Sequence, residues 1–157
     1  MIVILDNIRS MHNVGSIFRT ADAADVEKII LCGITPGPLD KYGRPNSRVT
    51  KVSLGAEEFV KWEHAESTSA TIDALKKQDP AIEIYAVELH PDAVNYKELT
   101  VFNPSHSVLI LGGEVDGLSS NILKRTTNIL KIPMLGRKES LNVSVAFGII
   151  AYHFAKC

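Results

Sequence analysis

Short apolar runs alternate with helical segments along the chain, and this alternation is the strongest constraint on its fold. Apolar runs predict strands at 1–5, 27–31, 60–62, 82–87, 108–111 and 129–132. Helical spacing and capping residues predict helices at 14–24, 47–54, 67–77, 118–125 and 142–154. Strands that alternate with helices are typical of an α/β domain, with a mostly parallel sheet and helices on both faces. The 157 residues form one such domain, without a repeat or linker.

The composition excludes several classes of protein. Hydrophobic residues make up 45% of the chain, which supports one core. No apolar run approaches the roughly 18 residues that span a bilayer, and no basic region precedes the first strand, as it would in a signal peptide. Cys32 and Cys157 suggest neither a disulfide framework nor a zinc site, and the five histidines lack ligand spacing. We therefore expect a cytoplasmic protein that uses no membrane and no metal.

Charge is unevenly distributed, although the net charge is only −1. The net charge is +2 over residues 1–55, −8 over 56–119 and +5 over 120–157. A neutral total argues against a general nucleic-acid coat protein. If the two ends meet in the fold, they form a mildly basic face opposite an acidic one. The alternative is that the asymmetry is chance.

The C-terminal helix is apolar nearly all round its circumference. Its apolar residues are Val143, Val145, Ala146, Phe147, Ile149, Ile150, Tyr152 and Phe154. One face can pack on the sheet, and the rest also needs burial, which a partner subunit would supply.

The first polar segment at a strand end contains Asn13 and Arg19, six positions apart near the start of a helix. Taken alone, Asn13 is best interpreted as the N-cap of that helix. Arg19 alone is best interpreted as a solvated helix charge.

The second segment, 111–119, follows a strand directly and contains Gly112, Gly113 and Glu114. Glycines let a backbone approach a ligand closely, and ligands of open α/β sheets bind at the carboxyl ends of strands. The simpler alternative is a strand-to-helix turn. The pattern is neither a dinucleotide fingerprint nor a phosphate-binding loop.

The third segment, 132–146, passes from a strand through a loop into the last helix. Ser140 and Asn142 lie at the start of that helix, where capping alone could explain them.

In order and spacing, the three segments resemble the motifs of the SpoU (TrmH) family of RNA ribose methyltransferases, in the SPOUT superfamily. The Asn-to-Arg spacing of the first motif matches Asn13 and Arg19. Gly-x-Glu-x-x-Gly-Leu-Ser matches 112–119, and Ile-Pro-Met with Ser-Leu-Asn-Val-Ser-x-Ala matches 132–134 and 140–146. The resemblance covers essentially the whole chain.

The resemblance implies a C-terminal trefoil knot, a homodimer and S-adenosylmethionine as cofactor. The positions that correspond to cofactor contacts are Gly112, Ile132 and Leu141, with Gly113, Met134 and Leu89 beside them. Members of the family often carry a further RNA-binding domain, which this sequence does not show.

The resemblance also implies ribose 2′-O-methylation of tRNA or rRNA, with Arg19 at the reacting hydroxyl. A guanidinium keeps its proton up to about pH 12, so we expect Arg19 to bind phosphate and stabilise developing negative charge. The alternative is that a neighbouring phosphate deprotonates Arg19, which then acts as the base. Asn13, Glu114, Ser140 and Asn142 would position the reacting groups, with Glu114 and Arg19 as an orienting pair.

Affinity for a structured RNA would come from basic residues of the catalytic dimer. The candidates are Arg9, Lys41, Arg44, Arg48, Arg137 and Lys138. A solvated turn is the alternative for the basic loop 41–48.

Three other functions stay open. The chain could be a knotted dimer that binds RNA or cofactor without catalysis, although the intact motif residues argue against this. A nicotinamide-dependent oxidoreductase lacks support because the glycine fingerprint is missing after the first strand. Methylation of a small molecule or protein is opposed only by the family resemblance.

Overall fold

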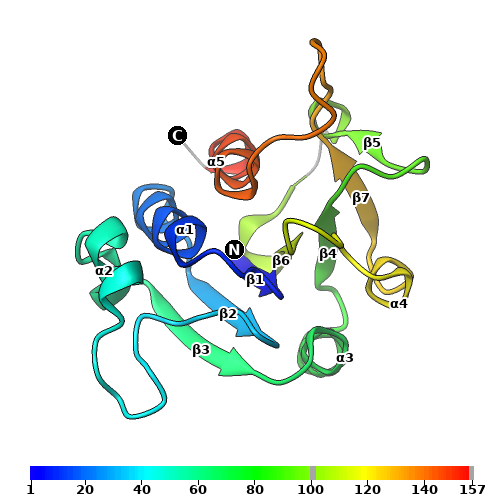
Figure 1. Cartoon of the computed structure of the whole chain (residues 1–157). Coiled ribbons are helices and arrows are strands. Elements are labelled where there is room, and N and C mark those ends of the chain that lie inside the picture. The colour runs from blue at the N-terminus through cyan, green and yellow to red at the C-terminus, as the bar shows by residue number, and fades with distance from the viewer. Residues whose placement is uncertain (100–101, 156–157) are drawn as a thin grey trace.

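The structure is a computed structural model that describes residues 1–99 and 102–155. Within these residues one seven-stranded sheet has the order β3-β2-β1-β6-β4-β7-β5, and every neighbouring pair is parallel (Figure 1). The strands are β1 (Ile2–Asp6), β2 (Lys28–Cys32), β3 (Lys61–Ala65), β4 (Glu83–Val87), β5 (Val94–Asn95), β6 (Ser107–Gly112) and β7 (Asn128–Lys131). The α-helices are α1 (Met11–Ala23), α2 (Ser47–Ser53), α3 (Thr68–Gln78), α4 (Ser120–Leu123) and α5 (Val143–Phe154). Short 3₁₀ helices are η1 (Ala56–Glu58), η2 (Tyr96–Glu98) and η3 (Pro104–His106).

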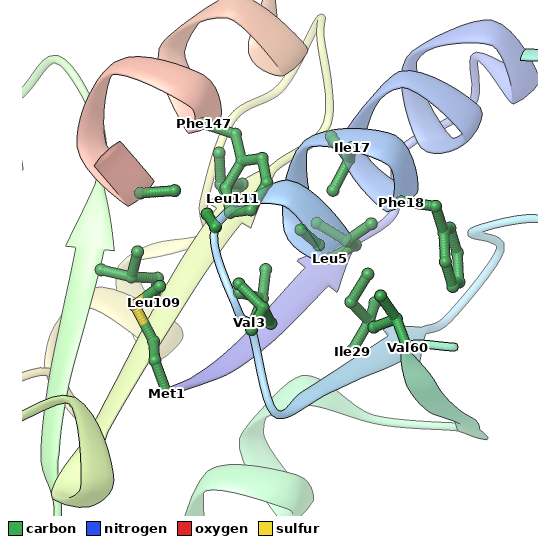
Figure 2. Close-up of a cluster of buried hydrophobic side chains, with 14 of the residues drawn as sticks. Met1, Val3, Leu5, Ile17, Phe18, Ile29, Val60, Leu109, Leu111 and Phe147 are labelled. Carbon is green, nitrogen blue, oxygen red and sulfur yellow. The ribbon is translucent and has the colours of Figure 1, made fainter. Parts of the chain in front are cut away.

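Helices cover both faces of the sheet, as the sequence predicted. Successive side chains of β1 point to opposite faces, so Val3 and Leu5 join one buried cluster and Ile4 joins the other. The first cluster includes residues of α1 and α5, among them Phe18 and Phe147 (Figure 2). Residues of α3 and α4 pack into the second. Each fully buried side chain of this kind contributes about 1.5–3 kcal/mol.

Two predicted elements have different limits in the structure. The helix predicted from 14 begins at Met11, because Ser10 is its N-cap and accepts from the backbone N–H of Asn13. The strand predicted at 60–62 runs from Lys61 to Ala65. It lies at the sheet edge with mostly exposed or half-buried side chains, so its second half is too polar to resemble a strand.

The loop 33–48 is tied to the end of β1. The Thr35 hydroxyl is buried, donates to the backbone carbonyl of Leu5 at 2.9 Å and accepts from the Ile8 N–H at 3.0 Å. Further along, Asp40 accepts from the backbone N–H groups of Tyr42 and Arg44. These bonds close the loop into a defined turn.

The parallel arrangement brings the carboxyl ends of β1, β6, β4 and β7 to one edge of the sheet. The three polar segments identified in the sequence come after β1, β6 and β7 in the chain. They therefore start at this edge of the sheet. Of the helices in 1–99 and 102–155, none is long and apolar enough to cross a membrane.

Candidate active site

Asn13 joins the three polar segments by two side-chain hydrogen bonds. Its Nδ2 donates to Glu114 Oε1 at 2.8 Å, and its Oδ1 accepts from Asn142 Nδ2 at 3.0 Å. Asn13 is only 6% exposed, whereas its partners Glu114 and Asn142 are exposed, so both bonds are partly buried. The interpretation of Asn13 as an N-cap is therefore wrong, because Ser10 caps the helix and leaves Asn13 free to bridge.

Glu114 closes the amino end of α1 from outside the helix. Its carboxylate also accepts from the backbone N–H groups of Arg9 at 3.2 Å and Ser10 at 3.3 Å. A negative charge is favourable there because the first N–H groups of a helix lack partners and carry partial positive charge. Burial raises the pKa of Glu114, but the bonds from Asn13, Arg9 and Ser10 outweigh burial and hold that pKa below its usual value. Glu114 is thus an ionised acceptor, poorly suited to take up a proton.

Arg19 does not join this network. The predicted pairing of Glu114 with Arg19 is wrong for the single chain, because Glu114 is occupied by Asn13 and the start of α1. Arg19 is exposed on α1, and no other part of the described chain forms a hydrogen bond or ion pair with it. It lines neither of the two pockets described below.

Asn142 has two tasks in the structure. Its Oδ1 accepts from the Ser144 N–H at 2.9 Å and so caps α5, while its Nδ2 donates to Asn13. The capping interpretation of this residue is therefore confirmed, and its bond to Asn13 also places it beside Glu114. Ser140, two positions earlier, is exposed.

A pocket of about 510 Å³ opens beside the network, and we call it the Ile132 pocket. All six residues predicted to contact a cofactor line it: Leu89, Gly112, Gly113, Ile132, Met134 and Leu141. Glu114, Ser140 and Asn142 line it as well. The pocket thus combines apolar walls with a few polar groups, the usual make-up of a small-molecule site.

Gly112 is needed for a reason other than the one predicted. A Cβ at this position would lie 2.6 Å from the carbonyl carbon of Gly117 and 2.8 Å from the N of Leu118. The turn 113–117 folds back against the strand end, so the chain's own backbone, rather than a ligand, occupies the space.

Sequence reasoning missed Glu88, which holds two walls of the Ile132 pocket together. Its Oε1 accepts from the Leu89 N–H and its Oε2 from the Leu118 N–H, each at 2.9 Å. A Cβ on Gly117, where φ is +62°, would lie 2.5 Å from Glu88 Oε2. The only sequence signal for Glu88 is its position directly after a predicted strand. Acidic residues are too common at such positions for this signal to identify a site residue.

The basic residues predicted to bind RNA separate into three groups. Arg44 is bound to Asp40 at 2.8 Å and lies with Lys41 over the Tyr42 ring. Arg9 and Arg48 line a shallow groove together with His12 and Lys51, which the sequence did not single out. Arg137 and Lys138 are exposed on the loop between β7 and α5.

No group of three or more His, Cys, Asp or Glu side chains in 1–99 and 102–155 could hold a metal ion.

The fold and the site define an α/β protein whose ligand pocket lies at the carboxyl ends of parallel strands. The chain belongs to the SpoU rRNA Methylase family, whose model matches residues 1–152. It is 32% identical over 152 residues to the 23S rRNA (guanosine-2'-O-)-methyltransferase RlmB of Xanthomonas axonopodis pv. citri, and 31% identical over 154 residues to the tRNA (guanosine(18)-2'-O)-methyltransferase of Aquifex aeolicus. The AdoMet-bound rRNA methyltransferase of Sinorhizobium meliloti superposes with a TM-score of 0.82 at 30% identity.

These alignments cover nearly all of this chain but only part of its relatives. The matched region is 97% of this chain against 57% of the Xanthomonas protein and 67% of the Aquifex protein. For the Sinorhizobium structure the shares are 96% and 54%.

Proposed function

We propose that this chain transfers a methyl group from S-adenosylmethionine to a ribose 2′-hydroxyl of tRNA or rRNA. The observation that carries the proposal is the bonding of Asn13 to Glu114 and Asn142 at the rim of the Ile132 pocket. Membership of the SpoU family and two relatives named as guanosine 2′-O-methyltransferases support it.

The residues of the Ile132 pocket fit S-adenosylmethionine. The volume of about 510 Å³ lies in the usual range for small-molecule sites. Leu89, Ile132 and Leu141 offer apolar surface for the adenine ring, and the carboxylates of Glu88 and Glu114 suit a ligand with cationic groups. The cofactor supplies, when bound, a methyl group on a positively charged sulfur, open to attack by an oxygen.

The chain's own residues must orient the ribose and stabilise the charge on its oxygen. Ser140 and Asn142 place polar groups in the pocket lining, and the bond from Asn142 to the nearly buried Asn13 fixes the second of them. Because its pKa is lowered, Glu114 acts as a positioning residue. Arg19 would bind the phosphate beside the reacting ribose and offset its developing negative charge.

A homodimer would bring Arg19 to the pocket of the other subunit. One side of α5 is left without cover, with Val145 50% and Tyr152 52% exposed. These positions and half-buried Ile149 follow helical spacing, so they form one apolar stripe. Tyr152 lies near the carbonyl of Ala23 on α1, the helix that carries Arg19. In such a dimer this stripe would be buried against its copy, and the active site would be shared between the subunits.

A trefoil knot at the C-terminal part of the fold is a further element of the proposal. β7 lies between β4 and β5, so the chain from β4 to β5 crosses the carboxyl end of β7 before returning to β6. The chain then leaves β7 and packs α5 on α1 and β6. Phe154 of α5 stacks on Phe102 of the returning segment, with ring centroids 4.0 Å apart. Passage of residues 133–155 between the segments 88–99 and 102–106 would account for this arrangement.

Transfer of tritiated methyl from S-adenosylmethionine to total small RNA and rRNA tests the proposal. We expect label in one RNA class with wild-type protein, and a loss of at least about 100-fold in Arg19→Ala at unchanged cofactor affinity. Asp22→Ala, one turn further along the exposed side of α1, is the control. Normal cofactor binding with no label in any RNA would contradict the proposal and favour a binding protein.

A further inference from the structure

A second pocket, of about 410 Å³, lies at the carboxyl ends of β1, β2 and β6, and we call it the Asp6 pocket. It shares the turn 113–117 with the Ile132 pocket, so the two lie on either side of that turn. Of the six residues assigned to the cofactor, only Gly113 also lines the Asp6 pocket. A group bound there would be a close neighbour of one in the Ile132 pocket.

Asp6 supplies a hydrogen-bond acceptor in this pocket. The residue is only 6% exposed, and its Oδ1 accepts from Thr68 Oγ1 at 2.5 Å and from Asn7 Nδ2 at 3.2 Å. Oδ2 has no donor among the described residues. Every fully buried side-chain nitrogen or oxygen described does have a partner, so Oδ2 is open to the pocket that Asp6 lines. A carboxylate oxygen that faces a pocket without a protein donor is free to accept a hydrogen bond from a bound group.

Apolar side chains flank Asp6 from two sides. β2 and β6 pair with β1 on opposite edges, where Asp6 is aligned with Cys32 and Gly112. Shortly after these positions come Ile34, 62% exposed, and Val115, 79% exposed, and both line the pocket. Two exposed apolar groups around an acceptor suit a flat ring that is apolar on its faces and donates N–H groups at its edge.

We propose that the Asp6 pocket binds the base of the target nucleotide and selects guanine. This inference rests on the proposed function, which puts an RNA ribose at the Ile132 pocket. Enzymes that act on a single nucleotide read an extruded base by hydrogen bonds to its edge and by apolar contact with its faces. Guanine alone among the four bases presents an imino N–H and an amino group side by side. Asp6 Oδ2 accepts from the amino group, and the exposed Glu66, which lines the same pocket, offers a carboxylate to the imino N–H.

The first step is to identify the RNA that becomes labelled when total RNA is the substrate. That RNA is then synthesised with either guanosine or inosine at the methylated position. Inosine keeps the imino group and lacks the amino group, so the comparison needs no variant protein. We expect kcat/KM to fall about 10- to 100-fold with inosine, the cost of a lost hydrogen bond to a charged group. Equal rates on guanosine and inosine, or a methylated nucleotide other than guanosine, would overturn the inference.

Protein variants connect the selectivity to the pocket. Asp6→Asn keeps an acceptor for Thr68 and removes the charge, and we expect it to reduce the preference for guanosine over inosine while cofactor affinity stays unchanged. Ile34→Ala should raise KM for the RNA, with the exposed Phe59→Ala as matched control. Full preference for guanosine in Asp6→Asn would overturn the assignment. Absence of label in every RNA would instead contradict the proposed function itself, and this inference with it.

Discussion

The side chain of Asn13 donates to Glu114 over 2.8 Å, although 101 positions of sequence separate the two residues. This bond fixes the start of α1 against the turn that follows β6, and Asn142 extends it to the start of α5. Three strand ends are thereby held in one arrangement at the rim of the Ile132 pocket.

Removal of the charge on Glu114 should weaken both the fold and the site. Glu114→Gln loses an ionic acceptor for the N–H groups of Arg9 and Ser10 and the amide of Asn13. We expect the free energy of unfolding to fall by about 1 kcal/mol, because the carboxylate is partly open to solvent. Urea denaturation measures the change, and the exposed Glu58→Gln should change stability by less than about 0.5 kcal/mol.

The difference in stability between wild type and Glu114→Gln should depend on pH. The pKa of Glu114 is lower in the folded chain than in the unfolded one, so its stabilising effect is present above the unfolded value and is lost as pH falls through the folded value. The difference in stability between wild type and Glu114→Gln should therefore be full at neutral pH and shrink in acid, below about pH 4. Denaturation at several pH values measures it. A difference that grows in acid would show that Glu114 is not held ionised.

Gly117→Ala should disrupt the Ile132 pocket, whereas Gly43→Ala, at a glycine with a similar φ, should not. The new methyl group would meet Glu88 Oε2 at 2.5 Å and add strain at a φ of +62°. Gly43 has a similar φ of +76° with open space around it, so Gly43→Ala carries the backbone strain alone. We expect Gly117→Ala to cost more stability than Gly43→Ala and to weaken cofactor affinity, as measured by calorimetry. Equal effects would mean that the contact with Glu88 is unimportant.

Mixing two inactive variants tests whether Arg19 acts across a dimer. Arg19→Ala keeps its own pocket, and Ile132→Asp keeps Arg19 but disrupts the pocket. In a random mixture, half of the dimers would combine one of each, and each of these has one intact site, so roughly a quarter of wild-type activity should return. No recovery, with mixed dimers verified by sedimentation and differential tagging, would place Arg19 at the pocket of its own chain.

Reversal of charge should separate the basic residues by their environment. Arg48→Glu and Lys51→Glu change exposed groups of the shallow groove that also contains Arg9, and we expect weaker RNA binding with a smaller salt dependence. Arg44→Glu should matter less, because Arg44 is already paired with Asp40 at 2.8 Å. Filter binding across a salt series measures both. The opposite ranking would place the RNA at the turn that carries Arg44 rather than at the groove of Arg48 and Lys51.

Local sequence rules predicted what depends on neighbours in the chain. The central strands are apolar runs because helices cover both faces of the sheet, and their positions were correct to within a residue or two. β5 was missed because two residues, Val94 and Asn95, are too few for a periodic signal. The N-cap assigned to Asn13 failed because capping preference is local, while the partner of Asn13 lies on another strand end. Glu88 was missed for the same reason, since its importance comes from the distant Leu118 N–H.

The family motifs selected residues that lie close together in the structure, but they did not predict their contacts. All six predicted cofactor residues line one pocket, whereas the expected pairing of Glu114 with Arg19 is absent from the described chain. Motif spacing predicted which residues lie together around one pocket. It does not show which of them contact each other.

The position of the transferred methyl group tests the central claim most directly. RNA labelled by the wild-type protein is hydrolysed with alkali, which cleaves only beside a free 2′-hydroxyl. Ribose methylation predicts that the label is recovered in an alkali-resistant dinucleotide. Label recovered in mononucleotides would show a methylated base and would contradict the proposal of ribose 2′-O-methylation.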